Sequence, residues 1–237
     1  MSDRRFALLG SGEFEDWHGE VDRMLLEDRV GGVLILPTAS AKEGDSVFES
    51  WGEKGLEHYG RAGIPATVVD IRTREDASED PLIELLDTAA MVFFSGGNPW
   101  YLAEVLRGTP FWTRLVERLD QGLSYAGCSA GVACLTERTY DSDTDDFEQV
   151  FKPGLGFMRG VLFGPHWDMV DNWIPGARDA IAGSIAPGET LIGIDEQTAI
   201  VGDGSSWTVH GRSAAHILHD GSWTELRQGD PFELALA

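Results

Sequence analysis

The chain has 237 residues, 42% of them hydrophobic, and a formal net charge of −22 from 18 basic and 40 acidic residues. Such a chain can bury a full core, and its longest apolar runs fall short of the roughly 18–20 residues of a membrane span. The negative charge argues against nucleic acids and anionic membranes as partners. The apolar run after Arg5 is too short for a signal peptide, so we expect a cytoplasmic protein.

The first half of the chain alternates short apolar runs with amphipathic stretches of helical length. Repeated units of this kind predict a three-layer α/β/α fold with a mostly parallel, doubly wound sheet. We expect the strands at Phe6–Leu9, Val33–Leu36, Ala66–Val69, Met91–Phe94 and Leu123–Ala126. We expect the helices at Trp17–Leu26, Val47–Tyr59, Pro81–Leu86, Pro99–Val105 and Phe111–Leu119.

Glycine-rich turns follow three of these strands, at Gly10–Glu13, Ser95–Asn98 and Gly127–Gly131. The last is a G-x-S-x-G pentapeptide between an expected strand and a small, apolar helix, which is the context of a nucleophile elbow. Its glycines allow a tight turn that holds Ser129 in strained backbone angles. Ligands of such sheets bind at the carboxyl ends of the strands, so Ser129 is the candidate nucleophile.

The pattern changes after the elbow. Thr139–Glu148 predicts an acidic loop, and it lacks the glycine and glutamate spacing of a calcium loop. Cys128 and Cys134 read as small buried residues, and we predict no metal and no cofactor. Short antiparallel strands joined by Asp-Gly turns at 203–204 and 220–221 are expected at Leu191–Ile194, Ala199–Val201, Trp207–His210 and Ala215–Leu218. No linker or repeat interrupts the chain, so we predict one domain over residues 1–237.

A serine nucleophile needs a histidine base. Among the six histidines, His166 directly follows the apolar run Val161–Phe163 and so emerges at a strand end. The second candidate is His216, although strand packing is the simpler interpretation for the histidines of the C-terminal hairpins. We expect His18 and His58 to lie on surface helices, in solvent.

The acid that orients the base has two candidate sources. Asp195 and Glu196 follow the strand-like run Leu191–Ile194, and Asp143 lies in the acidic loop. An oxyanion hole needs two converging backbone N–H groups. Ala130, next to Ser129, offers one, and Gly97 or Asn98 in the second glycine turn offers the other.

Five motifs in a fixed order make the chain resemble peptidase family S51, the serine peptidases related to dipeptidase E and cyanophycinase. They are Gly-Ser-Gly-Glu, Phe-Ser-Gly-Gly-Asn, G-x-S-A-G, Pro-His-aromatic and Gly-Ile-Asp-Glu-x-Thr-Ala. Here they stand at Gly10–Glu13, Phe94–Asn98, Gly127–Gly131, Pro165–Trp167 and Gly193–Ala199. Together they span nearly the whole chain.

The resemblance implies a class I glutamine amidotransferase-like fold and a small peptide substrate. It implies Ser129 as nucleophile, His166 as base, Glu196 as orienting acid, and the amides of Gly97 and Ala130 as the oxyanion hole. A loop aspartate, for which Asp143 is the nearest match, ranks below Glu196. Cyanophycinases carry polar residues just before the histidine and clustered arginines after it. Here Gly164 and Pro165 precede it and the first arginine is Arg178, which argues against a β-linked aspartyl-arginine polymer as substrate.

Two other functions are compatible with the elbow. An α/β-hydrolase esterase would order its triad as serine, acid and histidine, here Ser129, Asp203 and His216. A non-catalytic domain of the same fold would bind a small ligand or a protein partner. A homodimer is the oligomeric state we would test first.

Overall fold

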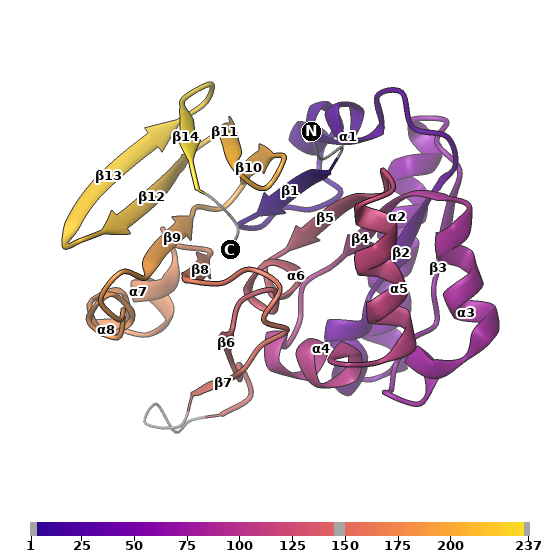
Figure 1. The fold of residues 1–237 in the computed structure, drawn as a ribbon, viewed down its shortest axis with the longest axis horizontal. Helices are drawn as coiled ribbons and strands as arrows, with labels where there is room; N and C mark the ends of the chain where they lie inside the picture. The colour runs from indigo at the N-terminus through magenta and orange to yellow at the C-terminus, as the bar shows by residue number, and fades with distance from the viewer. Residues whose placement is uncertain (1–3, 145–149, 235–237) are drawn as a thin grey trace.

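The computed structural model describes residues 4–144 and 150–234. Its larger sheet has eight strands in the order β14-β11-β10-β1-β5-β4-β2-β3, and a smaller sheet has the order β13-β12-β9-β8 (Figure 1). The larger sheet consists of β1 (Arg5–Leu9), β2 (Gly32–Leu36), β3 (Ala66–Val68), β4 (Ala89–Phe94), β5 (Ser124–Cys128), β10 (Thr198–Gly202), β11 (Ser206–Gly211) and β14 (Pro231–Glu233). The smaller sheet consists of β8 (Val161–Pro165), β9 (Thr190–Ile194), β12 (Ala214–His219) and β13 (Ser222–Arg227).

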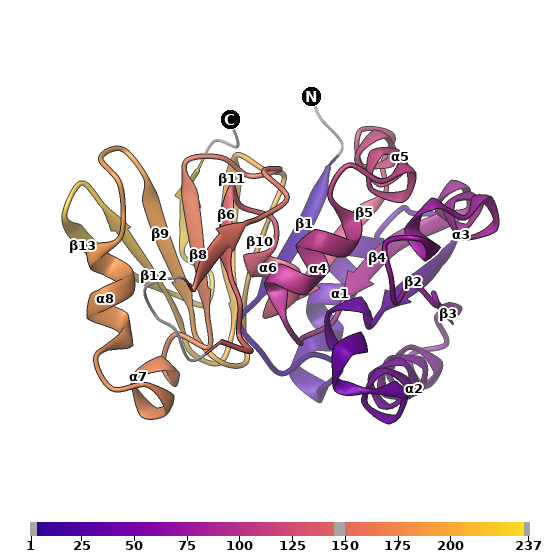
Figure 2. The ribbon, with the colours of Figure 1, turned by 90° about the horizontal axis from the view of Figure 1, so that it is seen from below.

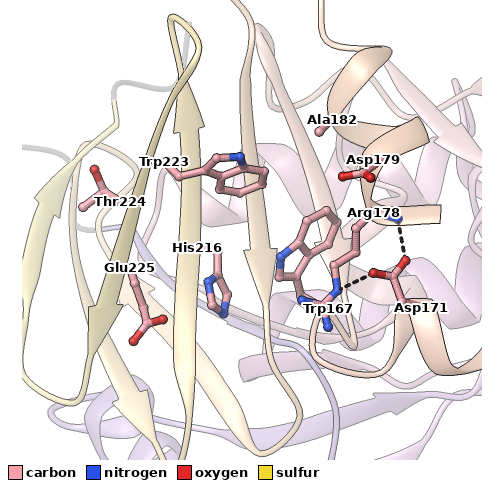
Figure 3. A pocket seen from close by; sticks show the side chains of 9 residues that line it. All are labelled: Trp167, Asp171, Arg178, Asp179, Ala182, His216, Trp223, Thr224 and Glu225. Atoms are coloured by element: carbon pink, nitrogen blue, oxygen red, sulfur yellow. Dashed lines mark hydrogen bonds and ion pairs between the residues drawn. The ribbon is translucent and has the colours of Figure 1, made fainter. Parts of the chain in front are cut away.

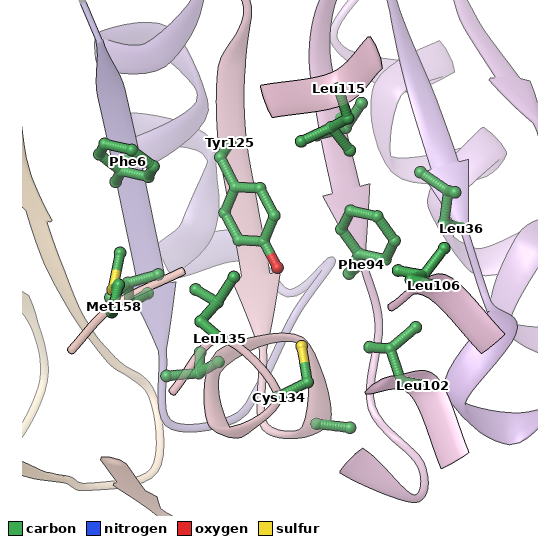
Figure 4. Close-up of a cluster of buried hydrophobic side chains, with 14 of the residues drawn as sticks. Phe6, Leu36, Phe94, Leu102, Leu106, Leu115, Tyr125, Cys134, Leu135 and Met158 are labelled. Carbon is green, nitrogen blue, oxygen red and sulfur yellow. The ribbon is translucent and has the colours of Figure 1, made fainter. Parts of the chain in front are cut away.

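Helices cover both faces of the parallel half of the larger sheet, as Figure 2 shows. Side chains alternate between the faces, so in β1 Phe6 and Leu8 join one buried cluster while Ala7 and Leu9 join the other. The first cluster packs against α4, α5 and α6 (Figure 4), and the second packs against α1 and α2. The helices are α1 (Gly19–Leu26), α2 (Asp45–Arg61), α3 (Asp80–Glu84), α4 (Pro99–Leu106), α5 (Pro110–Leu119), α6 (Ala130–Ala133), α7 (Val170–Trp173) and α8 (Ala177–Gly183).

The predicted α/β class is confirmed, and the elements expected in the first half are all present with small shifts in their bounds. The strand predicted at Leu123–Ala126 instead runs over Ser124–Cys128. The reason is that Cys128 pairs with Leu9 of β1, so the ladder continues to the turn itself. No helix in the part of the chain that the structure describes is both long and apolar enough to cross a membrane.

The second half differs from the prediction in several places, and α7 and α8 are among the elements that were not predicted. β9, expected in an antiparallel sheet, pairs in parallel with β8 as well as antiparallel with β12. β13 and β14 were not predicted, because β13 exposes residues on both of its faces and has no apolar alternation. The predicted acidic loop begins as β6 (Arg138–Tyr140), which pairs with β7 (Phe151–Pro153); its residues 145–148 lie outside the described residues.

The prediction that His18 and His58 are solvated is wrong. Both rings are buried, His18 completely, between the helices and the sheet. They stack on each other with ring centroids 5.3 Å apart and lie against Phe14 and Phe93. Histidine is a polar residue that also packs in cores, so the sequence alone does not tell a histidine on the buried face of a helix from one on its exposed face. Cys128 and Cys134 are buried, as predicted.

Candidate active site

Ser129 stands where three neighbouring strands end. β5 lies between β1 and β4, and all three run in parallel, so their glycine turns meet at one edge of the sheet. Ser129 joins β5 to α6 with φ 50° and ψ −102°, a positive φ that is rare for a residue with a side chain. The predicted strand–turn–helix geometry of a nucleophile elbow is therefore present at this residue.

His166 and Glu196 reach Ser129 from the smaller sheet. They follow β8 and β9, which are parallel neighbours, so their backbones leave the sheet side by side. His166 Nε2 lies 3.0 Å from Ser129 Oγ, and His166 Nδ1 lies 3.0 Å from Glu196 Oε1. The side chain of His166 is 23% exposed, so solvent and a substrate can reach it. The three residues thus form a continuous hydrogen-bonded chain.

Gly10 brings the two sheets close enough for this contact. Its N–H donates to the Thr198 carbonyl at 2.9 Å, and a Cβ built on Gly10 would lie 2.1 Å from the carbonyl oxygen of Asp195. No residue with a side chain fits this approach. The first glycine turn therefore fixes the segment that carries Glu196 against the end of β1.

Two backbone N–H groups beside Ser129 are available to a ligand. In the second glycine turn the Gly96 N–H donates to Glu13 Oε1 and the Asn98 N–H donates to the Ala39 carbonyl. Within residues 4–144 and 150–234, the N–H groups of Gly97 and Ala130 have no such partner. The geometry therefore favours Gly97 over Asn98 as the second donor.

Gly97 is also required by sterics. It has φ 137°, and a Cβ there would lie 2.4 Å from the backbone carbon of Ala39. The neighbouring Gly96 is less constrained, because its Cβ would meet Glu13 Oε1 at 3.4 Å and Ser129 Cβ at 3.8 Å. These distances place the turn directly beside the candidate nucleophile.

Glu13 has a role that the sequence did not reveal. Its carboxylate accepts the Gly96 N–H at 3.0 Å and the Cys128 thiol at 2.9 Å, so it joins the ends of β4 and β5. Burial, with the Glu13 carboxylate beside it, raises the pKa of the Cys128 thiol well above its ordinary value. Cys128 therefore stays protonated and does not compete with Ser129 as a nucleophile. The Gly-Ser-Gly-Glu motif was the available signal.

The alternative acids have other partners. Asp195 accepts hydrogen bonds from Ser213 and from His216 Nε2, at 2.7 Å and 3.0 Å. Asp143 Oδ2 accepts a hydrogen bond from the side-chain amide of Asn98 at 2.8 Å. Both are close to the site, but it is Glu196 that contacts His166.

The residues of the esterase alternative do not come together. The Asp203 carboxylate accepts backbone N–H groups of Ser205 and Ser206 and so closes the turn between β10 and β11. These bonds, that of Ser206 foremost, hold the pKa of Asp203 below its ordinary value. His216 is hydrogen-bonded to Asp195, not to Asp203. Ser129, Asp203 and His216 follow one another along the chain as an esterase triad would, but Asp203 and His216 are not paired in the structure.

The buried Asp195 carboxylate predicts a pH effect on stability. Burial by itself raises its pKa, but the hydrogen bonds from His216, Ser213 and Ala214 outweigh burial and hold the pKa below the ordinary 3.8. A carboxyl whose pKa is depressed on folding adds stability above its unfolded pKa and loses it as the pH falls through the folded pKa. We expect the gap in unfolding free energy between wild type and Asp195→Asn to be present at pH 6 and pH 5 and to shrink towards pH 3.

Urea unfolding at pH 6, 5, 4 and 3 measures this gap. Comparing the two proteins at each pH cancels the general acid destabilisation of so acidic a chain. A gap that is the same at pH 3 as at pH 6 would contradict the assignment.

The backbone of Glu196 is held in place by the segment that follows His166. Its backbone N–H donates to Asp168 Oδ1 at 2.9 Å, and the Asp168 carbonyl accepts a hydrogen bond from Arg178. Arg178 also pairs with Asp171, at 3.5 Å. The first arginine after His166 is therefore engaged with carboxylates and carbonyls of its own segment.

A cavity of about 490 Å³ lies between α7, α8 and the hairpin β12–β13 (Figure 3). The indoles of Trp167 and Trp223, with centroids 5.7 Å apart, and the His216 ring line it together with charged residues. Trp167 directly follows His166, so the cavity borders the candidate site. Ser129 is not among its lining residues, so it is not the place where a substrate carbonyl would meet the serine.

A mostly parallel α/β sheet with a serine at the turn after a central strand is an architecture of many hydrolases. Residues 6–210 match the model of Peptidase family S51, so the chain belongs to peptidase family S51. The resemblance expected from the five motifs is thereby confirmed.

Relatives in sequence and structure agree with this membership. The chain is 27% identical over 214 residues to a cyanophycinase of Trichormus variabilis, a match covering 85% of this chain and 64% of the relative. A cyanophycinase of Geminocystis herdmanii is 25% identical over 209 residues, covering 79% and 72%. The crystal structure of a peptidase from an acI-B1 Actinobacterium superposes with a TM-score of 0.87 at 32% identity, covering 98% of this chain and 97% of that one. The chain spans about 64% of the length of the Trichormus cyanophycinase.

Proposed function

We propose that the protein is a serine exopeptidase of the dipeptidase type, which hydrolyses small peptides through an acyl-enzyme on Ser129. The observation that carries the proposal is the 3.0 Å distance between Ser129 Oγ and His166 Nε2 at a turn of positive φ. Membership in a peptidase family supports a peptide as the substrate.

In the proposed mechanism His166 acts first as a base. Glu196 accepts the N–H at Nδ1, which leaves Nε2 free to take the proton of Ser129 as its oxygen attacks the scissile carbonyl. The N–H groups of Gly97 and Ala130 stabilise the negative charge that develops on the carbonyl oxygen. His166 then gives its proton to the leaving amine, and the acyl-enzyme remains. A water molecule, deprotonated by His166, hydrolyses this ester and restores Ser129.

The test combines a fluorophosphonate probe with a dipeptide library. We expect wild type to gain one phosphonyl adduct, on the peptide that contains Ser129, and to hydrolyse a subset of the dipeptides. Ser129→Ala should lose the adduct, with turnover reduced on the order of 10³–10⁶-fold. Hydrolysis that survives this substitution would overturn the mechanism. A folded wild type that takes no label but binds a metabolite would favour the non-catalytic alternative.

We also propose that the protein works in the cytoplasm without nucleic-acid or membrane partners. The net charge of −22 supports this proposal, because a field of that sign repels polyanions. The proposed homodimer predicts a particle of twice the mass of the chain, which light scattering at micromolar protein concentration measures.

A further inference from the structure

Beneath the first glycine turn, three potential metal ligands meet in the core. His18, Asp22 and His58 are buried, and each offers a ligand atom within 4.8 Å of those of the other two. His18 lies in the 3-10 turn Asp16–His18 and Asp22 lies one turn further on in α1, while His58 lies in α2. The cluster therefore joins two elements far apart in sequence.

His18 is the observation that points to a ligand. Its side chain has no exposed surface, and neither Nδ1 nor Nε2 has a hydrogen-bond partner among the described residues. A buried polar group without a partner costs on the order of 1–3 kcal/mol and calls for an explanation such as an ion. His18 Nε2 faces Asp22 Oδ1 at 3.5 Å, too far for a hydrogen bond.

From this arrangement we propose that His18, Asp22 and His58 supply three ligands to a buried divalent transition metal, zinc in the first place. Two imidazole nitrogens and one carboxylate oxygen are a donor set that suits zinc and not calcium or magnesium. Ligands about 2.0–2.1 Å from a tetrahedral ion stand roughly 3.3 Å apart, close to the His18–Asp22 spacing. His58 Nε2 is 2.6 Å from Asp22 Oδ2, a hydrogen bond that the ion would replace as the atoms separate by roughly 0.7 Å.

The surroundings match a buried metal site. The Tyr59 hydroxyl donates to Asp22 Oδ1 at 3.0 Å, the kind of outer contact that orients a ligating carboxylate. The aromatic rings of Phe14 and Phe93 lie around the imidazoles, so no substrate reaches the ion. Phe14 directly follows Glu13, so the ion would stiffen the turn that carries this carboxylate. The sequence did not predict the site, because His58 lies 36 residues from Asp22.

Protein purified from zinc-supplemented medium tests the site. We expect one zinc per chain by mass spectrometry, two imidazole ligands by X-ray absorption, and a Tm lowered by roughly 5–10 °C when a chelator removes the ion. His58→Gln should lose at least about 100-fold in zinc affinity together with the Tm response. The control His219→Gln changes the same residue type on the half-exposed end of β12 and should behave as wild type.

These readouts do not depend on peptidase activity. A wild type that holds no zinc, or zinc with fewer than two imidazole ligands, would overturn the site. The same holds if His58→Gln binds zinc as tightly as the control. The X-ray absorption measurement uses wild type alone, so it decides the question even if the His58 variant does not fold.

Discussion

His166→Ala is expected to abolish peptide hydrolysis, with a loss in kcat on the order of 10³–10⁶-fold, while His216→Ala retains most of it. The reason is that His166 Nε2 is the nitrogen within hydrogen-bond distance of Ser129 Oγ, whereas His216 Nε2 bonds Asp195. Without a base the serine hydroxyl stays protonated and is a weak nucleophile. Steady-state kinetics on the best dipeptide of the library measure both variants.

The two variants form a matched pair. Both histidines are hydrogen-bonded to a carboxylate and are similarly exposed, 23% and 22%, so loss of an imidazole should cost each fold a comparable amount. Melting curves check this point before the kinetics are compared. Equal losses of kcat in two folded variants would contradict the role of His166, and a loss confined to His216→Ala would revive the esterase alternative.

The parallel half of the fold could be predicted from the sequence because its strands are buried on both faces. Runs such as Met91–Phe94 are wholly apolar, and β4 is fully buried as expected. The C-terminal strands carry less information. In β13 most side chains face solvent, and its place is fixed by register with β12, from Ala214 opposite Arg227 to His219 opposite Ser222. Pairing of this kind leaves no apolar period in the sequence.

The candidate site, too, could be predicted from the sequence only in part. Ser129, His166 and Glu196 each follow a strand. The rule that ligands bind at the carboxyl ends of strands therefore predicts that the three residues lie in one site. The residues alone left Gly97 and Asn98 open and the family resemblance implied Gly97; the structure adds the physical reason, since the Ala39 carbonyl accepts the Asn98 N–H. The buried histidine pair required the structure as well, because a contact between His18 and His58, on different helices, has no local signature in the sequence.

Glu196→Gln is expected to lower kcat on the order of 10²–10⁴-fold with little change in Tm, because Glu196 is 39% exposed and its carboxylate bonds His166. A glutamine can present its amide N–H to Nδ1, which would fix the wrong tautomer and leave Nε2 protonated against Ser129. The neighbouring substitution Asp195→Asn should do the opposite: its carboxylate is 6% exposed and joins His216, so the Tm falls and kcat changes little.

A loss of kcat in Glu196→Gln alone and a loss of Tm in Asp195→Asn alone would distinguish a residue that orients the base from one that stabilises the fold. A single substitution cannot make this distinction. Peptide kinetics and thermal melts of both variants measure it. A folded Glu196→Gln protein with kcat intact would transfer the role of orienting acid to Asp195 or to Asp143.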